Sequence, residues 1–180
     1  MLIDRPAAAE HPPFALPYIV AAAHAMSVAE HDDILALLAT QPAAFQAMLE
    51  DADPELVDYA YAPDKWTLGE SLVHVADSER VFAYRLLRIA RGDTTPLPGF
   101  DHDAWVPASG ASGRQFSDIL TEFWAVRSAT VMLIQSLPPE ALDRMGTASS
   151  HPVSVRALAW MIAGHAAHHL TLTRTHYLGG

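Results

Sequence analysis

Apolar residues recur every three or four positions along much of the chain, which is the spacing of one face of an α-helix. The first such segment runs from Asp32 to about Ala52, and Asp32 and Asp33 suit the positively polarised start of a helix. Pro42 is expected to kink or divide this helix, because proline has no amide hydrogen and clashes with the preceding turn.

The next helix is marked at both ends. Thr67 and Glu70 form a T-x-x-E capping box, in which each side chain accepts a hydrogen bond from the other residue's backbone amide. Gly92 follows Arg91 and suits the position just after a helix. These signals predict a helix over Leu68–Arg91.

Two more helices follow by the same reasoning. Ser112 and Gln115 are expected to open a helix that Pro138 and Pro139 prevent from continuing past Leu137. Ser154 is expected to cap a last helix, which runs to Leu178. Three of the predicted helices are about 24 residues, or roughly 36 Å, long. Rods of matched length pack as a bundle.

The fold predicted from these elements is all-α, a four-helix bundle over residues 31–180, because no segment shows clear two-residue alternation. The connection from Thr94 to Ala111 is long enough to return along the whole bundle, so the second and third helices can be either parallel or antiparallel. Residues 1–30 are rich in alanine and proline and are expected to form an extended or partly mobile arm with little chemistry.

Composition and charge exclude several functions. The formal net charge of −10 disfavours binding to nucleic acid and to anionic membranes, and no apolar run reaches the length of a membrane span. The chain has no cysteine, so any metal must be held by nitrogen and oxygen. We expect a cytoplasmic protein that acts on a small molecule, with a homodimer possible.

Two histidines interrupt the apolar stripe of the last helix. His165 and His169 are four residues apart, so their rings project from successive turns and can bind one ion through neutral nitrogens. The alternative is a pair of core histidines that hydrogen-bond to the protein. The rest of the stripe is apolar except at its end: Val155, Leu158, Ile162, Leu172 and His176.

A third ligand is needed for a stable site, and His74 on the second helix is the candidate. Helical periodicity places His74 at the edge of the buried face, which would set the metal beside an open groove. Asp77 is one turn further along and is the candidate catalytic residue, either orienting a ligand ring or relaying a proton.

Other polar residues have weaker claims. Glu79 lies at the centre of an apolar face and is expected either to pair with Arg127 or to support the histidines from behind. His168 is expected either at the surface or as a group that supports the metal ligands without binding the ion. Four more are possible contacts of substrate or pocket: His102, Trp105, His151 and His176.

Four motifs, taken in their order and separation, resemble the DinB/YfiT-like superfamily over roughly residues 34–178. They are Trp66-Thr67-Leu68-Gly69-Glu70, His74-Val75-Ala76-Asp77-Ser78-Glu79, Leu97-Pro98-Gly99-Phe100-Asp101 with the following Trp105, and Gly164-His165-Ala166-Ala167-His168-His169. The resemblance implies an up-down-down-up bundle with a long crossover between helices two and three. It also implies a divalent metal, commonly zinc or nickel, held by His74, His165 and His169.

Relatives of this kind include metal-dependent hydrolases and transferases that use low-molecular-weight thiols. The sequence therefore predicts a metal-dependent enzyme of one of these two types. The alternative is a stress-associated bundle that binds a metal or a small molecule without catalysis. At a structural site a fourth protein ligand such as Asp77 or Glu70 would complete the coordination of the metal. At a catalytic site one coordination position stays open to water or substrate.

Overall fold

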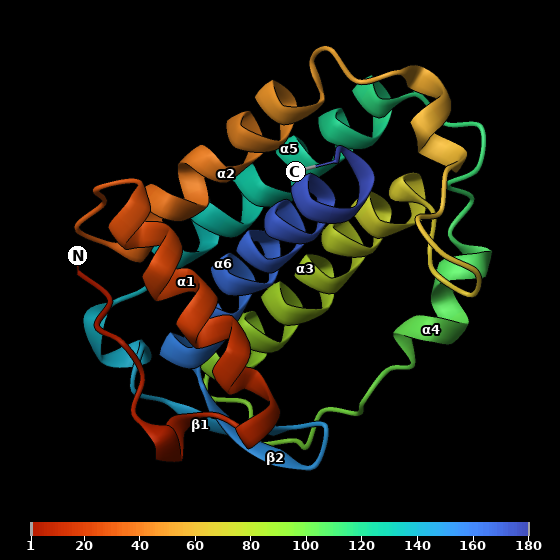
Figure 1. Cartoon of the computed structure of the whole chain (residues 1–180). Coiled ribbons are helices and arrows are strands. Elements are labelled where there is room, and N and C mark those ends of the chain that lie inside the picture. Colours follow the sequence, from red (N-terminus) through yellow and green to blue (C-terminus); the bar gives the residue numbers. More distant parts are fainter. Residues whose placement is uncertain (1, 180) are drawn as a thin grey trace.

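The computed structural model describes residues 2–179, and helices dominate this part of the chain (Figure 1). The helices are α1 (Leu16–Val28), α2 (Ile34–Leu49), α3 (Leu68–Ala90), α4 (His102–Trp105), α5 (Phe116–Gln135) and α6 (Val155–Leu172). A π-helical segment, Thr173–Tyr177, continues α6. The two strands are β1 (Met145–Ala148) and β2 (His151–Ser154).

Four of the helices form the predicted bundle. α3 packs against α5 and α6, and α2 packs against the same two helices on the opposite side. α2 and α6 run in one direction while α3 and α5 run in the other, which is the up-down-down-up course (Figure 1). The connection from α3 to α5 returns along the bundle and carries α4. The parallel arrangement of the second and third bundle helices is therefore confirmed.

The predicted helix starts are mostly found as local hydrogen bonds. Glu70 N donates to Thr67 Oγ1 at 3.1 Å and Thr67 N donates to a Glu70 carboxylate oxygen at 2.8 Å, so the capping box at α3 is complete. Ser154 Oγ accepts from Ala157 N at 2.9 Å at the start of α6. The box predicted for Ser112 and Gln115 does not form, because α5 begins only at Phe116 and the Gln115 side chain makes no cap.

Pro42 does not divide α2, which is continuous from Ile34 to Leu49. Proline leaves the carbonyl four residues earlier without its helical partner. That carbonyl belongs to Leu38, and it accepts a hydrogen bond of 2.8 Å from Arg127 Nη1 instead. The break in the helical hydrogen bonds is thus used to attach α5 to α2.

Residues 16–28, assigned above to an extended arm, form α1. This helix packs along α6, with Ile19 and Ala22 fully buried. Periodicity gave no sign of it because the segment is apolar or alanine on nearly every side. Gly164 permits the close approach, since a Cβ added there would lie 1.8 Å from the Tyr18 carbonyl oxygen.

The two strands form one antiparallel hairpin, with Met145 opposite Ser154 and Ala148 opposite His151. Each strand has only four residues, too few for alternation to be recognised in the sequence. The hairpin covers the end of the bundle at which α3 finishes and α6 begins (Figure 1).

Candidate metal centre

Three histidines from two helices meet at the side of the bundle. His165 and His169 lie one turn apart on α6, and His74 faces them from α3. The ring centroids of the three pairs are 4.6 to 5.2 Å apart, and all three side chains are buried. The sequence-predicted ligand set is therefore brought together in space.

The spacing of the nitrogens fits a shared cation. One ligating nitrogen from each ring lies within 4.8 Å of the others, and His74 Nε2 is 3.1 Å from His165 Nε2. Zinc–nitrogen bonds of about 2.0 to 2.1 Å in a tetrahedron place neighbouring nitrogens about 3.3 Å apart. The closest pair is thus already near the separation that metal ligands require.

The histidines are also in the correct charge state for metal binding. Burial, with a further contribution from His102, lowers the pKa of His74 to about 4. Burial and the neighbouring histidines lower the pKa of His165 and of His169 well below the ordinary value. The three rings are therefore neutral near pH 7, and each can offer a lone pair to a cation.

Two serine hydroxyls contact the rings of the histidine cluster. Ser71 Oγ lies 3.0 Å from His169 Nδ1, which leaves Nε2 of that ring available to a metal. Ser78 Oγ lies 3.4 Å from Nδ1 and 3.3 Å from Nε2 of His74. Contacts of this kind orient ligand rings at metal sites.

Asp77, the predicted catalytic residue, is placed differently. Its carboxylate receives a 2.9 Å hydrogen bond from Arg80 Nη1, and Arg80 also pairs with Glu122 on α5. Residues three and four positions after His74 lie on opposite flanks of it. Ser78 is on the flank that faces the bundle, and Asp77 is on the flank that faces solvent. Ser71 and Ser78, and not Asp77, therefore contact the histidine rings and are placed to orient them.

The cluster has no fourth protein ligand among residues 2–179, since the group of potential metal ligands consists of the three histidines. Glu70, one of the residues considered for closing the site, uses its carboxylate in the capping box of α3. Asp77 uses its own in the pair with Arg80. A cation held here would keep part of its coordination sphere for other molecules.

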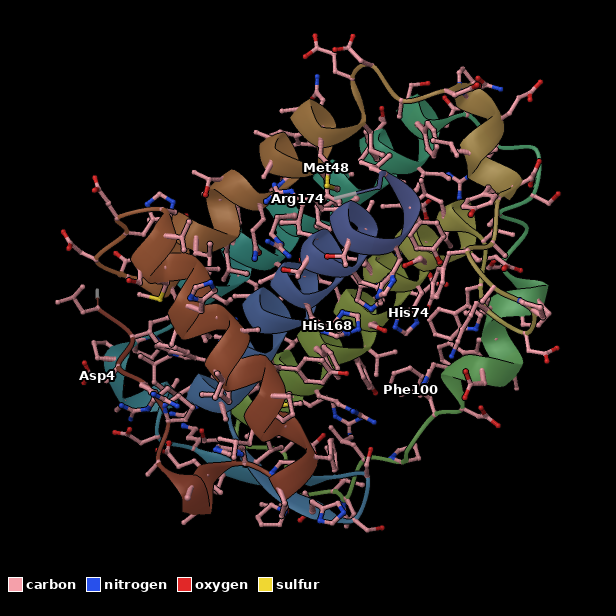
Figure 2. The ribbon with its side chains drawn as sticks, in the orientation of Figure 1. Asp4, Met48, His74, Phe100, His168 and Arg174 are labelled. Atoms are coloured by element: carbon pink, nitrogen blue, oxygen red, sulfur yellow. The ribbon has the colours of Figure 1, made fainter. Side chains whose placement is uncertain are left out.

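Two cavities adjoin the histidines. The first, of about 240 Å³, is lined by His74 and His165 and extends toward the β-hairpin. The second, of about 300 Å³, is lined by His74 and His169 and extends toward the C-terminal end of α6. His102 and Tyr18 line both. In Figure 2, His74 on α3, His168 on α6 and Phe100 on the connection after α3 are labelled in the same part of the molecule.

The remaining predicted residues divide into two groups. His102 lines both cavities, with its ring centroid 5.5 Å from that of His74, and exposed His168 borders the second cavity. By contrast, Trp105 is 45% exposed and packs on Phe100, and His176 stacks on Tyr61. His151 contacts Phe14.

Several residues that border the site were not assigned to it from the sequence. Trp66 packs against His74, and Tyr18 of α1 packs edge-on against His165 at 5.4 Å between ring centroids. Phe14 and Arg85 line the first cavity. Tyr18 reaches the site because Gly164, the residue before His165, lets α1 approach α6. The sequence signal for Phe14 and Tyr18 was only that they are aromatic residues within an alanine- and proline-rich segment.

The pairing predicted for Glu79 is confirmed. Arg127 Nε lies 2.9 Å and Nη2 lies 2.8 Å from the Glu79 carboxylate oxygens, with both side chains about 2% exposed. Arg127 Nη1 also donates to Gln41 Oε1 at 2.6 Å, and Gln41 Nε2 donates to Ala163 O at 2.7 Å. This network joins all four helices of the bundle.

Comparison with known proteins agrees with this architecture. A solved structure described as "YfiT from Bacillus subtilis is a probable metal-dependent hydrolase with an unusual four-helix bundle topology" is similar, with a TM-score of 0.71 and 18% sequence identity. The match covers 79% of this chain and 85% of that one, and it supports the fold. Among curated proteins, no sequence matches significantly. No helix within residues 2–179 is long and apolar enough to cross a membrane.

The family model for the DinB superfamily matches residues 37–172, which span α2 to α6 and include all three histidines. The chain therefore belongs to the DinB superfamily.

Proposed function

We propose that this protein is a divalent-metal-dependent enzyme that activates a small nucleophile, either water or a low-molecular-weight thiol, for attack on a small-molecule substrate. The observation that carries the proposal is the convergence of three buried, neutral imidazoles without a fourth protein ligand. A closed set of four ligands would favour a structural metal, and three ligands favour a catalytic one.

His74, His165 and His169 would hold the ion, with zinc or nickel as the proposed metal. When bound, such an ion supplies a Lewis acid that generates a nucleophile from water or a thiol near neutral pH. The hydroxyl of Ser71 contacts Nδ1 of His169 and would orient this ring, which leaves its Nε2 available to the ion. The rings of Trp66 and Tyr18 shield His74 and His165 from bulk water.

The presence of two cavities supports a reaction between two small molecules. Each cavity reaches a different histidine of α6, and both reach His74. A thiol cosubstrate in one cavity and an electrophile in the other would meet at the histidines. Because the chain has no cysteine, the thiol must come from outside the protein. Hydrolysis would require only one of the two cavities.

Metal analysis tests the first step of the proposal. Protein purified without chelators should contain about one divalent ion per chain, measured by inductively coupled plasma mass spectrometry. His74→Ala and His165→Ala should each lose the ion, because two imidazoles hold a metal poorly. His31→Ala is the matched control, since His31 contacts Thr40 far from the cluster. Equal metal content in all four proteins would contradict the assignment.

Turnover is tested separately. The metal-loaded protein should be active in an ester and amide hydrolysis screen or in a thiol-conjugation screen, and His165→Ala should be inactive. Inactivity in both screens by a protein that retains its metal would favour the non-catalytic alternative, a metal-binding bundle.

A further inference from the structure

The first cavity carries an unbalanced positive charge. Arg85, on α3, is the one permanently charged side chain among the fifteen residues that line it, all of which lie in the described part of the chain. No aspartate or glutamate lines this cavity. The protein as a whole has a net charge of −10, so a basic cavity runs against its overall charge.

Arg85 is buried and has no carboxylate partner within residues 2–179. Its side chain is 5% exposed, and burial lowers the pKa of its guanidinium. Five other arginines differ from Arg85, because each forms an ion pair with an aspartate or glutamate: Arg80, Arg88, Arg114, Arg127 and Arg156. A buried charge without a counter-ion is costly, and an anionic ligand would remove that cost.

The hydrogen bonds of Arg85 leave donors for such a ligand. Arg85 makes two hydrogen bonds, and one nitrogen, Nη2, donates both of them: to Pro98 O at 2.7 Å and to Ser149 Oγ at 3.0 Å. The guanidinium also lies over the Phe100 ring at 5.5 Å. These contacts hold the group in place without neutralising it, while Nε and Nη1 make no hydrogen bond to the described residues.

The remaining walls of the cavity indicate what the rest of the ligand is like. They are mostly aromatic and aliphatic, and they include Phe14, Phe82, Phe100, Val153, Leu158 and Met161. His74 and His165 border the same space, so the charged group and the metal centre face one ligand. The volume of about 240 Å³ is below the roughly 300 to 1,000 Å³ of typical ligand sites, which favours a small molecule.

We propose that the first cavity binds a small aromatic or branched aliphatic monocarboxylate, with its carboxylate on Arg85 and its apolar body against the aromatic wall. The far end of this ligand faces His74 and His165. A single guanidinium matches the one negative charge of a carboxylate and can donate two parallel hydrogen bonds to it. This inference names the class of small molecule that the first cavity takes, and it rests on the proposed function only for the role of the histidine end.

Calorimetry with matched acids and amides tests the proposal on the full-length, metal-loaded protein. Phenylacetate and 4-methylpentanoate should each bind at least about tenfold more tightly than phenylacetamide and 4-methylpentanamide, because an ionic hydrogen bond is lost with the charge. Arg85→Gln should weaken binding of the acids by about tenfold or more and leave the amides nearly unchanged. Arg88→Gln, which removes the same charge three residues away beside Asp93, should bind the acids like the wild type.

The wild-type comparison alone can overturn the inference, even if Arg85→Gln fails to fold. Equal binding of acid and amide, no binding of either acid, or tighter binding of phenyl phosphate than of phenylacetate would each overturn it. Failure of the proposed function gives a different result. In that case the metal or the turnover would be missing, while binding of the acids would still depend on Arg85.

Discussion

Two buried polar clusters share α3, and they differ in how completely their groups are satisfied. The carboxylate of Glu79 is bonded by Arg127, whose remaining donors reach Gln41 and the Leu38 carbonyl. His74 lies five residues earlier on the same helix, and its ring nitrogens face His165, the Ser78 hydroxyl and two cavities. The first cluster is closed by the protein, and the second is left open.

The difference distinguishes buried polar groups that fix the packing of the helices from buried polar groups that are left available to a ligand. In the Glu79 cluster every strong donor and acceptor has a partner from another helix, so the cluster fixes how the four helices pack. In the histidine cluster three ring nitrogens converge without a carboxylate between them. The described part of the chain supplies no group that would bind all three nitrogens together. The predictions below test this contrast.

The largest effect is expected from breaking the closed cluster. Arg127→Met leaves Glu79 buried without a partner and should lower the free energy of unfolding by about 3 to 5 kcal/mol, measured by urea denaturation. The double variant Glu79→Leu with Arg127→Met removes both charges and should regain a large part of this loss. A loss below about 1 kcal/mol in the single variant would show that the network does not stabilise the fold.

Acid should affect the open cluster next most strongly. In the metal-free protein, the pKa of His74 is about 4, below the ordinary value of 6.5. As the pH falls below 6.5, the unfolded chain takes up a proton that the folded chain does not, so stability falls. The expected slope is about 1.4 kcal/mol per pH unit for each such proton, and the contribution of His74 levels off near pH 4.

This pH dependence can be measured by urea unfolding of chelator-treated protein between pH 7.5 and 4. His74→Gln removes one titrating group and should reduce the slope by about one proton. An unchanged slope would mean that His74 titrates alike in the folded and unfolded states.

A smaller effect is expected from the hydroxyl that orients a ligand ring. Ser71→Ala removes the 3.0 Å contact to His169 Nδ1 and should weaken metal binding by about 10 to 100-fold, measured by competition with a chelator of known affinity. Ser128→Ala, on the exposed face of α5, serves as the control. Wild-type affinity in Ser71→Ala would show that packing alone holds the ring.

The sequence predicted the elements whose signals are local. Each of these signals depends on only a few neighbouring residues: the capping box of α3, the cap of α6 and the prolines after α5. α1 was missed because a helix that is apolar on all sides has no periodicity, and its position depends on the contact between Gly164 and Tyr18. Which carbonyl Pro42 releases follows from the sequence, but the hydrogen bond that this carbonyl accepts from Arg127 does not.

The three-histidine cluster was predictable for a similar reason, and the groups around it were not. The four-residue spacing of His165 and His169 determines that their rings share one face of a helix. The first cavity, however, is built from segments far apart in the chain, including Phe14, Arg85 and Ser149. No spacing along the sequence relates these residues to one another, so the unpaired guanidinium becomes visible only in the folded chain.

The smallest effect is expected from changing Asp77. This change distinguishes the catalytic role predicted from the sequence from the pairing with Arg80 seen in the structure. Asp77→Asn weakens a pair between partly exposed side chains on the solvent-facing flank of α3. It should therefore change stability by no more than about 1 kcal/mol. Metal affinity and turnover should stay within about twofold of wild type, because the contacts to the ligand rings come from Ser71 and Ser78. A hundredfold fall in turnover with unchanged metal content would instead return the proton-relay role to Asp77, and would require its carboxylate to leave Arg80 when substrate binds.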